Sequence, residues 1–248
     1  MNILAIDTSG PVAGCAVMKD GRIAHLIAMN QGLTHSETIM PAVDAALSAS
    51  GLRCGDIDVF AAVAGPGSFT GVRIGICAAK GLAHAVGKPC CALDALEVLA
   101  MNFHGFDGLC CPILDARRGQ VYCAAFDMRD GMPRRALDDD AMALEGFLAL
   151  LPAGRRLVFA GDGIAAHGET VRALLGSRAL IAPENLRDIR ADAACLLASQ
   201  RPETWVEARL LRPLYLRAPQ AERERSARGQ VLPGDRAKGA APRVEAGT

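Results

Sequence analysis

Two acidic residues stand at similar points of the sequence, each at the end of an apolar run and just before a tight turn. Asp7 precedes the Ser-Gly-Pro turn at 9–11, and Asp115 precedes the Arg-Arg-Gly turn at 117–119. The backbone amides of such a turn can hold a phosphate, and the carboxylate beside them can hold a metal-bound water. The simpler interpretation is that each Asp accepts hydrogen bonds only from its own turn.

An internal repeat relates these two points. Asp7 is followed eight residues later by Cys15-Ala16, and Asp115 is followed eight residues later by Cys123-Ala124, so the offset is 108 residues in each case. Both segments read as a strand, an acidic residue, a turn and a returning strand, which favours internal duplication over chance. Two such hairpins facing each other would form a nucleotide cleft, and we expect a degenerate cleft that does not act on nucleotide. Its candidate residues are Asp7, Thr8, Ser9, Asp115 and Arg117.

A glycine loop between the predicted strand 59–64 and the predicted helix 70–86 is the most specific motif of the chain. It reads Gly65-Pro66-Gly67-Ser68, followed by Phe-Thr-Gly at 69–71. Glycines at this place let backbone amides approach a ligand or another backbone closely. The loop is neither a P-loop, which ends in Gly-Lys-Ser/Thr, nor the G-x-G-x-x-G dinucleotide fingerprint. A structural turn without a ligand is the open alternative.

The helix predicted over 70–86 is apolar nearly all round, with Arg73, Lys80 and His84 as its only strongly polar residues. Because a surface helix of a lone domain has a polar face, we expect one face to cover the sheet and another to meet a second chain. A helix predicted from the Thr-His-Ser-Glu capping box at 34–37 to Gly51 should lie beside it. A helix buried wholly within this chain is the alternative. The candidate interface residues are Ile39, Val43, Leu47, Gly71, Val72, Gly75, Ile76, Ala79, Leu82 and Ala83.

The remaining patterns predict an α/β fold of two lobes with mixed sheets. Three strands (2–8, 13–18 and 22–29) precede the two helices and the strand already described. In the second half we expect strands at 109–114, 121–126, 157–160 and 179–181, and helices at 140–151, 164–175 and 191–200. Pro41 should kink its helix or delay its start. We assign 1–103 to the first lobe, 104–217 to the second, whose last helix could pack back on the first, and 218–248 to a disordered tail.

Composition limits the function classes. The chain has 27 Lys+Arg and 27 Asp+Glu and no basic stripe with interleaved aromatics, so alone it is a poor RNA-binding module. The sequence shows neither a signal peptide nor a run of about 18 apolar residues, which predicts a cytoplasmic protein without a membrane partner. Its nine cysteines lack C-x-x-C spacing and are expected to be reduced core thiols, with Cys15 as a nucleophile the alternative.

Five segments together resemble the TsaB (YeaZ-type) proteins of bacterial tRNA threonylcarbamoyladenosine biosynthesis. They are 6–9 (IDTS), 35–37 (HSE), 64–75 (AGPGSFTGVRIG), 115–122 (DARRGQVY) and 213–217 (PLYLR), and they span most of residues 1–217. The resemblance implies a duplicated actin-like (ASKHA, ribonuclease H-like) fold. It also implies three partners, which are the catalytic paralogue TsaD, the ATPase TsaE and, through the complex, tRNAs that decode codons beginning with A. We also expect a homodimer through the same helix surface when the chain is alone, and no cofactor, apart from ATP or ADP held weakly or at an interface.

The resemblance also offers an internal test for catalysis. In the catalytic paralogue, two histidines four residues apart bind the metal from one helix face, and here Ala95 and Leu99 fall at those positions. Neither side chain can coordinate a metal. We therefore expect no catalytic residue and no metal site, and a scaffold role in threonylcarbamoyl transfer to the adenosine beside the anticodon. An actin-like phosphotransferase using Asp7 and a glycoprotease-type metallopeptidase are the alternatives.

Overall fold

The computed structural model describes residues 1–216, which form one compact unit; the tail predicted for 218–248 lies outside the described residues. Helices and strands follow the same order twice. The first set is β1 (Ile3–Asp7), β2 (Ala13–Lys19), β3 (Arg22–Met29), α1 (His35–Ala49), β4 (Val59–Gly65), α2 (Phe69–Val86), β5 (Pro89–Asp94) and α3 (Ala95–Ala100). The second set is β6 (Leu109–Asp115), β7 (Gln120–Asp127), β8 (Arg134–Ala143), α4 (Leu144–Leu150), β9 (Leu157–Ala160), α5 (Ile164–Leu175), β10 (Ala179–Ile181) and α6 (Ala191–Gln200), and a short β11 (Val206–Glu207) follows.

The two sheets share one strand order. The first sheet runs β11-β5-β4-β1-β2-β3 and the second runs β10-β9-β6-β7-β8. In each, the opening strand pairs antiparallel with the next strand and parallel with the fourth, as β1 does with β2 and β4 and as β6 does with β7 and β9. Asp7 and Asp115 are the last residues of β1 and β6. The internal duplication predicted from the sequence is therefore confirmed.

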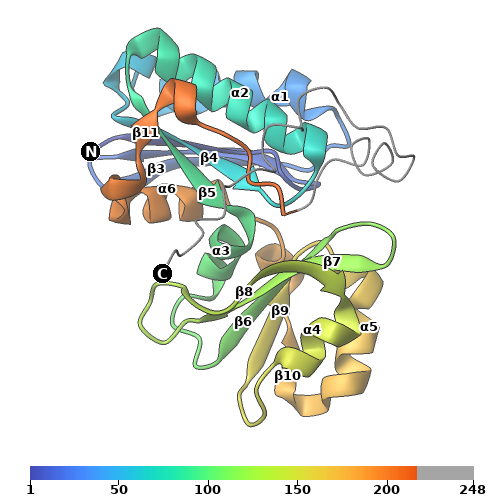
Figure 1. Cartoon of the computed structure of the whole chain (residues 1–248). Coiled ribbons are helices and arrows are strands. Elements are labelled where there is room, and N and C mark those ends of the chain that lie inside the picture. Colours follow the sequence, from blue (N-terminus) through green and yellow to red (C-terminus); the bar gives the residue numbers. More distant parts are fainter. Residues whose placement is uncertain (217–248) are drawn as a thin grey trace, which may run out of the picture. The chain divides into compact units, whose positions relative to one another are not determined.

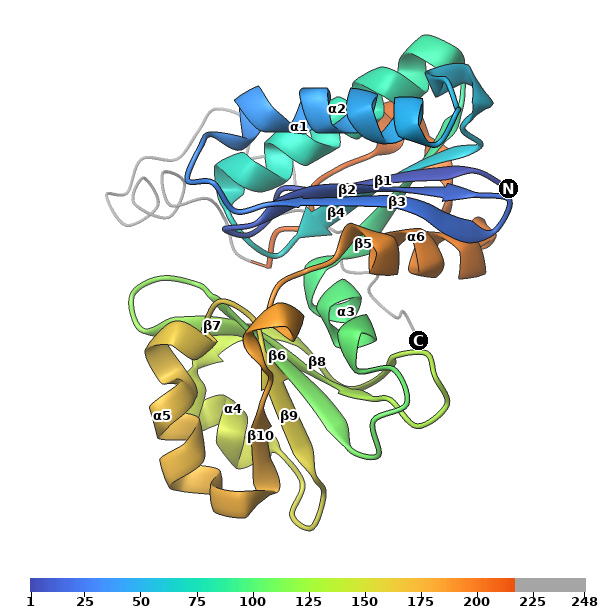
Figure 2. The ribbon, with the colours of Figure 1, turned by 180° about the vertical axis from the view of Figure 1, so that it is seen from behind.

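Helices cover both faces of the first sheet. On one face, α1 contacts β2 and β3 while α2 contacts β1, β4 and β5 (Figure 1). On the other face, α6 contacts all of β1 to β5, so residues 191–200 belong with the first sheet although they follow the second in sequence (Figure 2). The short helix α3 contacts β4 and β5 of the first sheet and β6 and β7 of the second.

The apolar core of residues 1–216 falls into three clusters. One packs α1 and α2 on the first sheet, with Val43 and Ile76 among its members. Another packs α4 and α5 on the second sheet and includes Phe147. The third is centred on α3 and α6 and takes in residues of both sheets, such as Ile3 and Phe126. The two sheets thus share one continuous apolar cluster.

The first helix begins at the predicted segment, but the late start expected of Pro41 and the capping box are both wrong. α1 begins at His35 and runs through Pro41, so the delayed start is wrong. Pro41 is exposed, and the carbonyl that its missing N–H leaves unpaired belongs to the exposed Glu37, where water can reach it. The capping box does not form, because Thr34 makes no side-chain cap hydrogen bond and only its carbonyl accepts from Glu37 N, at 3.0 Å.

The prediction of a helix over 140–151 is wrong at its start. Residues 140–143 belong to β8, and α4 begins only at Leu144. The strand is an edge of its sheet, where charged side chains such as the Asp run at 138–140 are tolerated because one side faces solvent. Within the described residues, no helix combines the length and the apolar composition needed to cross a bilayer.

Candidate functional site

Asp7 is buried at the end of β1 and is held by its own turn. Its side chain is 1% exposed, and Oδ1 accepts hydrogen bonds from Ser9 N at 2.9 Å and Ser9 Oγ at 2.7 Å. Burial raises the pKa of Asp7 from 3.8 to about 6, against the lowering effect of the Ser9 hydrogen bonds. The neighbouring Thr8 is fully buried, and its Oγ1 donates to Gly71 O at 2.7 Å. The Asp7 hairpin is therefore tied to the first turn of α2.

Asp115, at the end of β6, is exposed. Its Oδ1 accepts from Arg117 N at 2.7 Å, and its Oδ2 lies 3.3 Å from Arg117 Nη1. Arg117 has a left-handed φ of 64°, which fits a tight hairpin turn. The simpler interpretation, an Asp that bonds its own turn, describes the Asp115 side chain, while the Asp115 backbone N–H donates to Asp162 Oδ1 at 2.9 Å.

The cleft beside Asp7 is acidic and small. Besides Asp7, its lining includes Asp162 and Asp188 from the second half of the chain and one cation, Arg187. Burial raises the pKa of Asp162 and of Asp188, and repulsion between carboxylates adds to both shifts. The cavity measures about 10 Å³, about the room that one water requires, whereas small-molecule sites occupy roughly 300–1,000 Å³. Neither this volume nor the three carboxylates suit a nucleotide phosphate.

Of the predicted cleft residues, Asp7 lines this cavity, whereas Thr8, Ser9, Asp115 and Arg117 do not. Sequence reasoning missed Asp162 and Asp188. The segment 161–163 (Gly-Asp-Gly) stands between β9 and α5, the place that the glycine loop takes between β4 and α2, so applying the duplication to this loop would have found Asp162. No pattern marks Asp188, which lies in an irregular segment before α6 and whose carbonyl accepts from Asn102 Nδ2 at 2.9 Å.

The glycine loop packs against the Asp7 hairpin. Ser68 N donates to Ser9 O at 2.7 Å, and a Cβ at Gly67 would collide with the same carbonyl. A Cβ at Gly65, which precedes Pro66, would lie 2.6 Å from Leu214 O. These contacts favour the structural alternative, in which the glycines allow close approach of two backbones and not of a ligand.

A ridge of small residues on α2 faces this chain's own sheet. It consists of residues that recur every four positions, Gly71, Gly75, Ala79 and Ala83. A Cβ at Gly75 would lie 2.6 Å from Thr8 Oγ1, and one at Gly71 would strike Thr8 O, so the missing side chains let α2 approach β1. The prediction that this ridge and its neighbours form a free partner surface is therefore wrong. Leu82 is half-buried, and the other nine predicted interface residues are buried in this chain: Ile39, Val43, Leu47, Gly71, Val72, Gly75, Ile76, Ala79 and Ala83.

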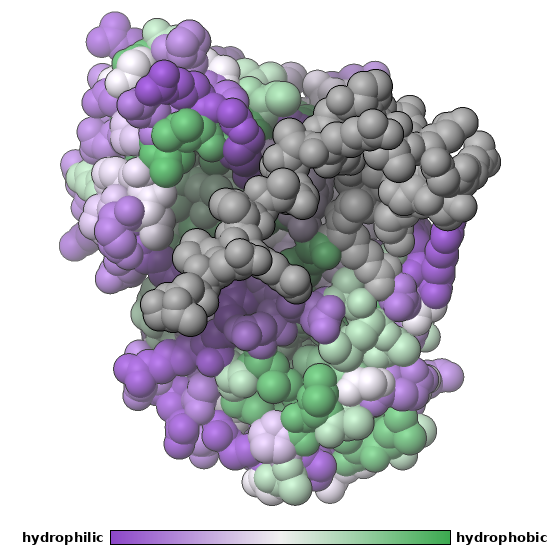
Figure 3. Space-filling view, in the orientation of Figure 1, coloured by the Kyte–Doolittle hydropathy of each residue, from purple (hydrophilic) through white to green (hydrophobic). Residues whose placement is uncertain are grey.

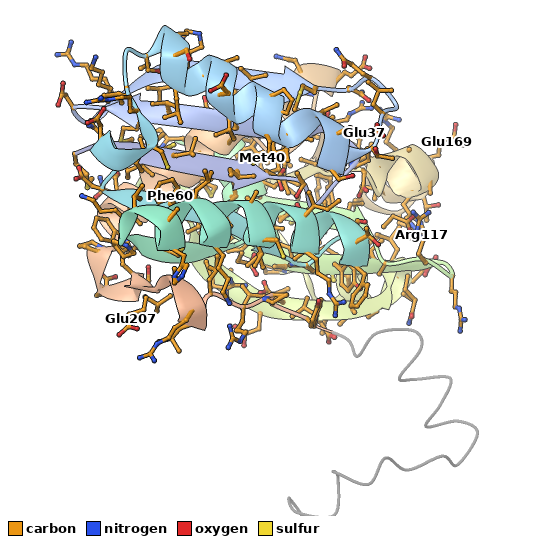
Figure 4. All side chains as sticks on the ribbon, turned by 90° about the horizontal axis from the view of Figure 1, so that it is seen from above. Glu37, Met40, Phe60, Arg117, Glu169 and Glu207 are labelled. Carbon is orange, nitrogen blue, oxygen red and sulfur yellow. The ribbon has the colours of Figure 1, made fainter. Side chains whose placement is uncertain are left out.

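A different face of the same two helices is exposed. Figure 4 shows α1 and α2 side by side, with Met40 labelled on α1. We define the α1–α2 outer face by its exposed residues, which are Met40, Asp44 and Ser48 of α1 and Cys77, Gly81 and Ala85 of α2. The three α2 residues recur every four positions and are small, so another helix could pack there at close range.

The helix α3, which the resemblance places at the metal-binding helix of the catalytic paralogue, is apolar here. Ala95 and Leu99 of α3 are 0% exposed and belong to the apolar cluster shared by the two sheets. Among the described residues, no three His, Cys, Asp or Glu side chains gather where they could hold a metal. The acidic residue of α3, Glu97, is engaged by Arg201 through hydrogen bonds of 2.6 and 2.8 Å.

The buried carboxyl of Asp7 predicts a pH-dependent stability. Its folded-state pKa of about 6 lies above the ordinary 3.8, so its contribution is fully favourable below about pH 4 and is lost as pH rises through 6. Asp7→Asn keeps an acceptor for Ser9 but carries no charge. We expect the variant to be more stable than the parent chain by about 1–3 kcal/mol at pH 8, with the gain shrinking as pH falls to 5, measured by urea unfolding.

Asp44→Asn is the control for these urea unfolding measurements at two pH values. Asp44 is exposed on α1, and its substitution should change the free energy of unfolding by less than about 0.5 kcal/mol at either pH. Equal stabilisation by both substitutions, or a gain from Asp7→Asn that does not depend on pH, would contradict the assignment of a charged buried carboxyl.

Comparison with known proteins gives one consistent family. A family model described as TsaD, tRNA N6-adenosine threonylcarbamoyltransferase, matches residues 30–224. The Bacillus subtilis tRNA threonylcarbamoyladenosine biosynthesis protein TsaB is 34% identical over 223 residues, which are 90% of this chain and 96% of that protein. The tRNA N6-adenosine threonylcarbamoyltransferase of Chlorobaculum tepidum is 36% identical over 111 residues, 39% of this chain and 31% of that protein.

A solved structure agrees with the sequence relatives. A Pseudomonas aeruginosa protein described as similar to the peptidase YeaZ superposes with a TM-score of 0.74 and 27% identity, covering 87% of this chain and 99% of that chain. The duplicated strand order is that of the actin-like fold predicted from the sequence. Since the Bacillus match covers nearly the whole of both proteins, the chain belongs to the TsaB family.

Proposed function

We propose that this chain is a non-catalytic subunit of the tRNA N6-adenosine threonylcarbamoyltransferase complex, where it binds the catalytic paralogue TsaD. The observation that carries the proposal is the apolar α3, in which Ala95 and Leu99 are fully buried at the positions of the paralogue's metal ligands. Family membership supports the tRNA-modification setting. TsaE and tRNA join through the same complex, and the chain needs no cofactor of its own, apart from ATP or ADP held weakly or at a subunit interface.

The α1–α2 outer face is the surface proposed for TsaD, and for a second copy when the chain is alone. The inner sides of both helices are used by this chain's own core, so a partner must bind the outer side. Small residues at Cys77, Gly81 and Ala85 leave room for a partner helix, and Met40, which is 42% exposed, adds apolar area.

Gly81→Arg tests this surface. A side chain at Gly81 meets nothing within 4 Å in this chain, so the variant should fold, yet an arginine there would fill the space for a partner helix. We expect co-purification with TsaD, and the tRNA transfer that depends on it, to fall at least tenfold, since a buried unpaired charge costs several kcal/mol.

Leu150→Arg is the matched control. Figure 3 shows that hydrophobic side chains also gather over α4, and Leu150, at the end of α4, is 56% exposed. An arginine there should leave TsaD binding unchanged. If Gly81→Arg binds TsaD like the parent chain, or if Leu150→Arg alone abolishes binding, the outer face is not the docking surface. Transfer by the purified chain without TsaD would overturn the non-catalytic role itself.

The phosphotransferase and metallopeptidase alternatives find less support. The cleft beside Asp7 has the volume of about one water and presents three carboxylates. A metallopeptidase requires a set of metal ligands, and the described residues contain no such group.

A further inference from the structure

Residues 209–216, which we call the carboxyl-terminal strap, lie against α2 and the glycine loop. Leu211 is 1% exposed and belongs to the apolar cluster under α2. Lys80 Nζ donates to Arg209 O at 3.0 Å, and Leu214 N donates to Ala64 O at 2.7 Å. The strap is therefore fixed at several points along its length, and Figure 1 shows it, coloured orange to red, beside α2.

The end of the strap builds an ordered aromatic pair on the surface. The rings of Phe69 and Tyr215 are stacked, with centroids 5.4 Å apart and planes at 28°. The Arg73 guanidinium carbon lies 3.8 Å from the Phe69 centroid and 5.9 Å from the Tyr215 centroid, and Arg73 Nε donates to the Tyr215 hydroxyl at 2.8 Å. Phe69 and Tyr215 are nevertheless 40% and 39% exposed. Two aromatic side chains are thus held in fixed positions while part of their surface stays open to solvent.

The cations beside this pair donate hydrogen bonds to neutral groups. Arg73 donates to a phenol, and Lys80 and Arg212 donate to backbone carbonyls. Among the described residues, none of the three forms an ion pair with a carboxylate, whereas Arg209 on the same strap pairs with Glu207 at 2.6 Å. Arg73 and Lys80 are seven residues apart on α2, which places them two turns and about 10 Å apart on one side of the helix. A chain with no net charge therefore has a local positive strip next to exposed aromatic rings.

Fixed, partly exposed aromatic rings beside cations that have no carboxylate partner among the described residues form the combination that binds single-stranded nucleic acid, by stacking of bases and contact with phosphates. We propose that the strap and the amino end of α2 contact an unpaired segment of RNA directly, with a base stacked on the Phe69–Tyr215 pair and phosphates near Arg73, Lys80 and Arg212. The inference rests on the proposed function for the identity of the RNA, which is the anticodon loop of the tRNA substrate. It gives the chain a contact with tRNA of its own, beyond binding TsaD.

Fluorescence anisotropy with a labelled anticodon stem-loop tests the proposal on the full chain alone, and again on its complex with TsaD. Tyr215→Leu removes the ring, and we expect it to weaken RNA binding by about 5- to 150-fold. This is the fold-change that corresponds to the loss of one base–aromatic stack, which is worth about 1–3 kcal/mol. Tyr215→Phe keeps the ring and loses only the hydroxyl, so its affinity should stay within about threefold. Lys80→Gln should lower the slope of log affinity against log salt by about one.

Arg134→Gln is the control, because Arg134 lies on β8 and pairs with Asp130 at 3.0 Å. It should leave RNA affinity and salt slope unchanged. If Tyr215→Leu binds RNA like the parent chain, or if the parent chain binds no RNA in either setting, the proposal is overturned. If Tyr215→Leu instead loses TsaD with RNA affinity intact, the strap is a protein surface and the proposal is equally overturned. Because Gly81→Arg tests TsaD binding on its own, failure of the proposed function is separately visible.

Discussion

Gly71→Ala is expected to destabilise the chain by about 3 kcal/mol, because overpacking a filled site typically costs about 1–3 kcal/mol and here the obstacle is backbone. A Cβ at Gly71 would strike Thr8 O and lie 3.2 Å from the Ser68 side chain. Relief would require α2 to move from β1, which would break the 2.7 Å bond from Thr8 Oγ1 to Gly71 O. Urea unfolding followed by circular dichroism measures the effect.

The matched control lies on the same helix. Gly81 is exposed, and a methyl group added there would have no atom within 4 Å, so Gly81→Ala should stabilise the chain by about 0.5–1 kcal/mol through helix propensity. The two glycine-to-alanine changes therefore have opposite signs. If Gly71→Ala and Gly81→Ala change the free energy of unfolding equally, the close contact at Gly71 does not set the distance between α2 and β1.

Removal of Arg201 should cost about 3–5 kcal/mol, the range for breaking a buried pair by deleting one partner. Glu97 is 8% exposed, and Arg201 supplies hydrogen bonds to both of its carboxylate oxygens. Arg201→Met leaves that carboxylate in the apolar surroundings of α3 without a partner. Removal of Glu97 should cost less, because the Arg201 side chain is 30% exposed and can reach water.

A double-mutant cycle measures the interaction between Glu97 and Arg201 apart from the contacts that each makes with other residues. Glu97→Leu combined with Arg201→Met should recover most of the stability lost in Arg201→Met, since no buried charge remains. Arg209→Met is the control, because its ion pair with Glu207 is exposed on both sides and is worth at most about 1 kcal/mol. If Arg201→Met costs no more than Arg209→Met, the pair does not fix α3.

Much of the fold could be predicted because its signals are local. The strands around Asp7 and Asp115 end in turns rich in glycine, and α5, α6, β9 and β10 fall on their predicted bounds. The strand β8 was missed because the acidic run at 138–140 hides the alternation of an edge strand. The repeat offset was sufficient to predict two equivalent sheets.

The site was harder to predict, for a geometric reason. Periodicity shows that α2 has small residues on two sides, but it does not say which side meets the sheet. The larger neighbours Val72 and Ile76 are buried together with Gly71 and Gly75. The small residues Cys77, Gly81 and Ala85 are therefore left on the outside of the helix. Asp162 and Asp188 come from loops, where contacts depend on the folded chain and not on spacing along it. The ring contact between Phe69 and Tyr215 joins residues 146 positions apart, and no local pattern could predict it.

The apolar cluster around α3 and α6 has a consequence for motion. Two-lobed proteins commonly work by hinge closure around a ligand. Here a hinge movement would separate members of one cluster, such as Leu99 and Phe126, at a cost of about 25 cal/mol for each Å² of apolar surface exposed. A body that keeps its shape has little conformational freedom to lose when it is bound. A partner that binds this chain therefore meets a surface that is already formed.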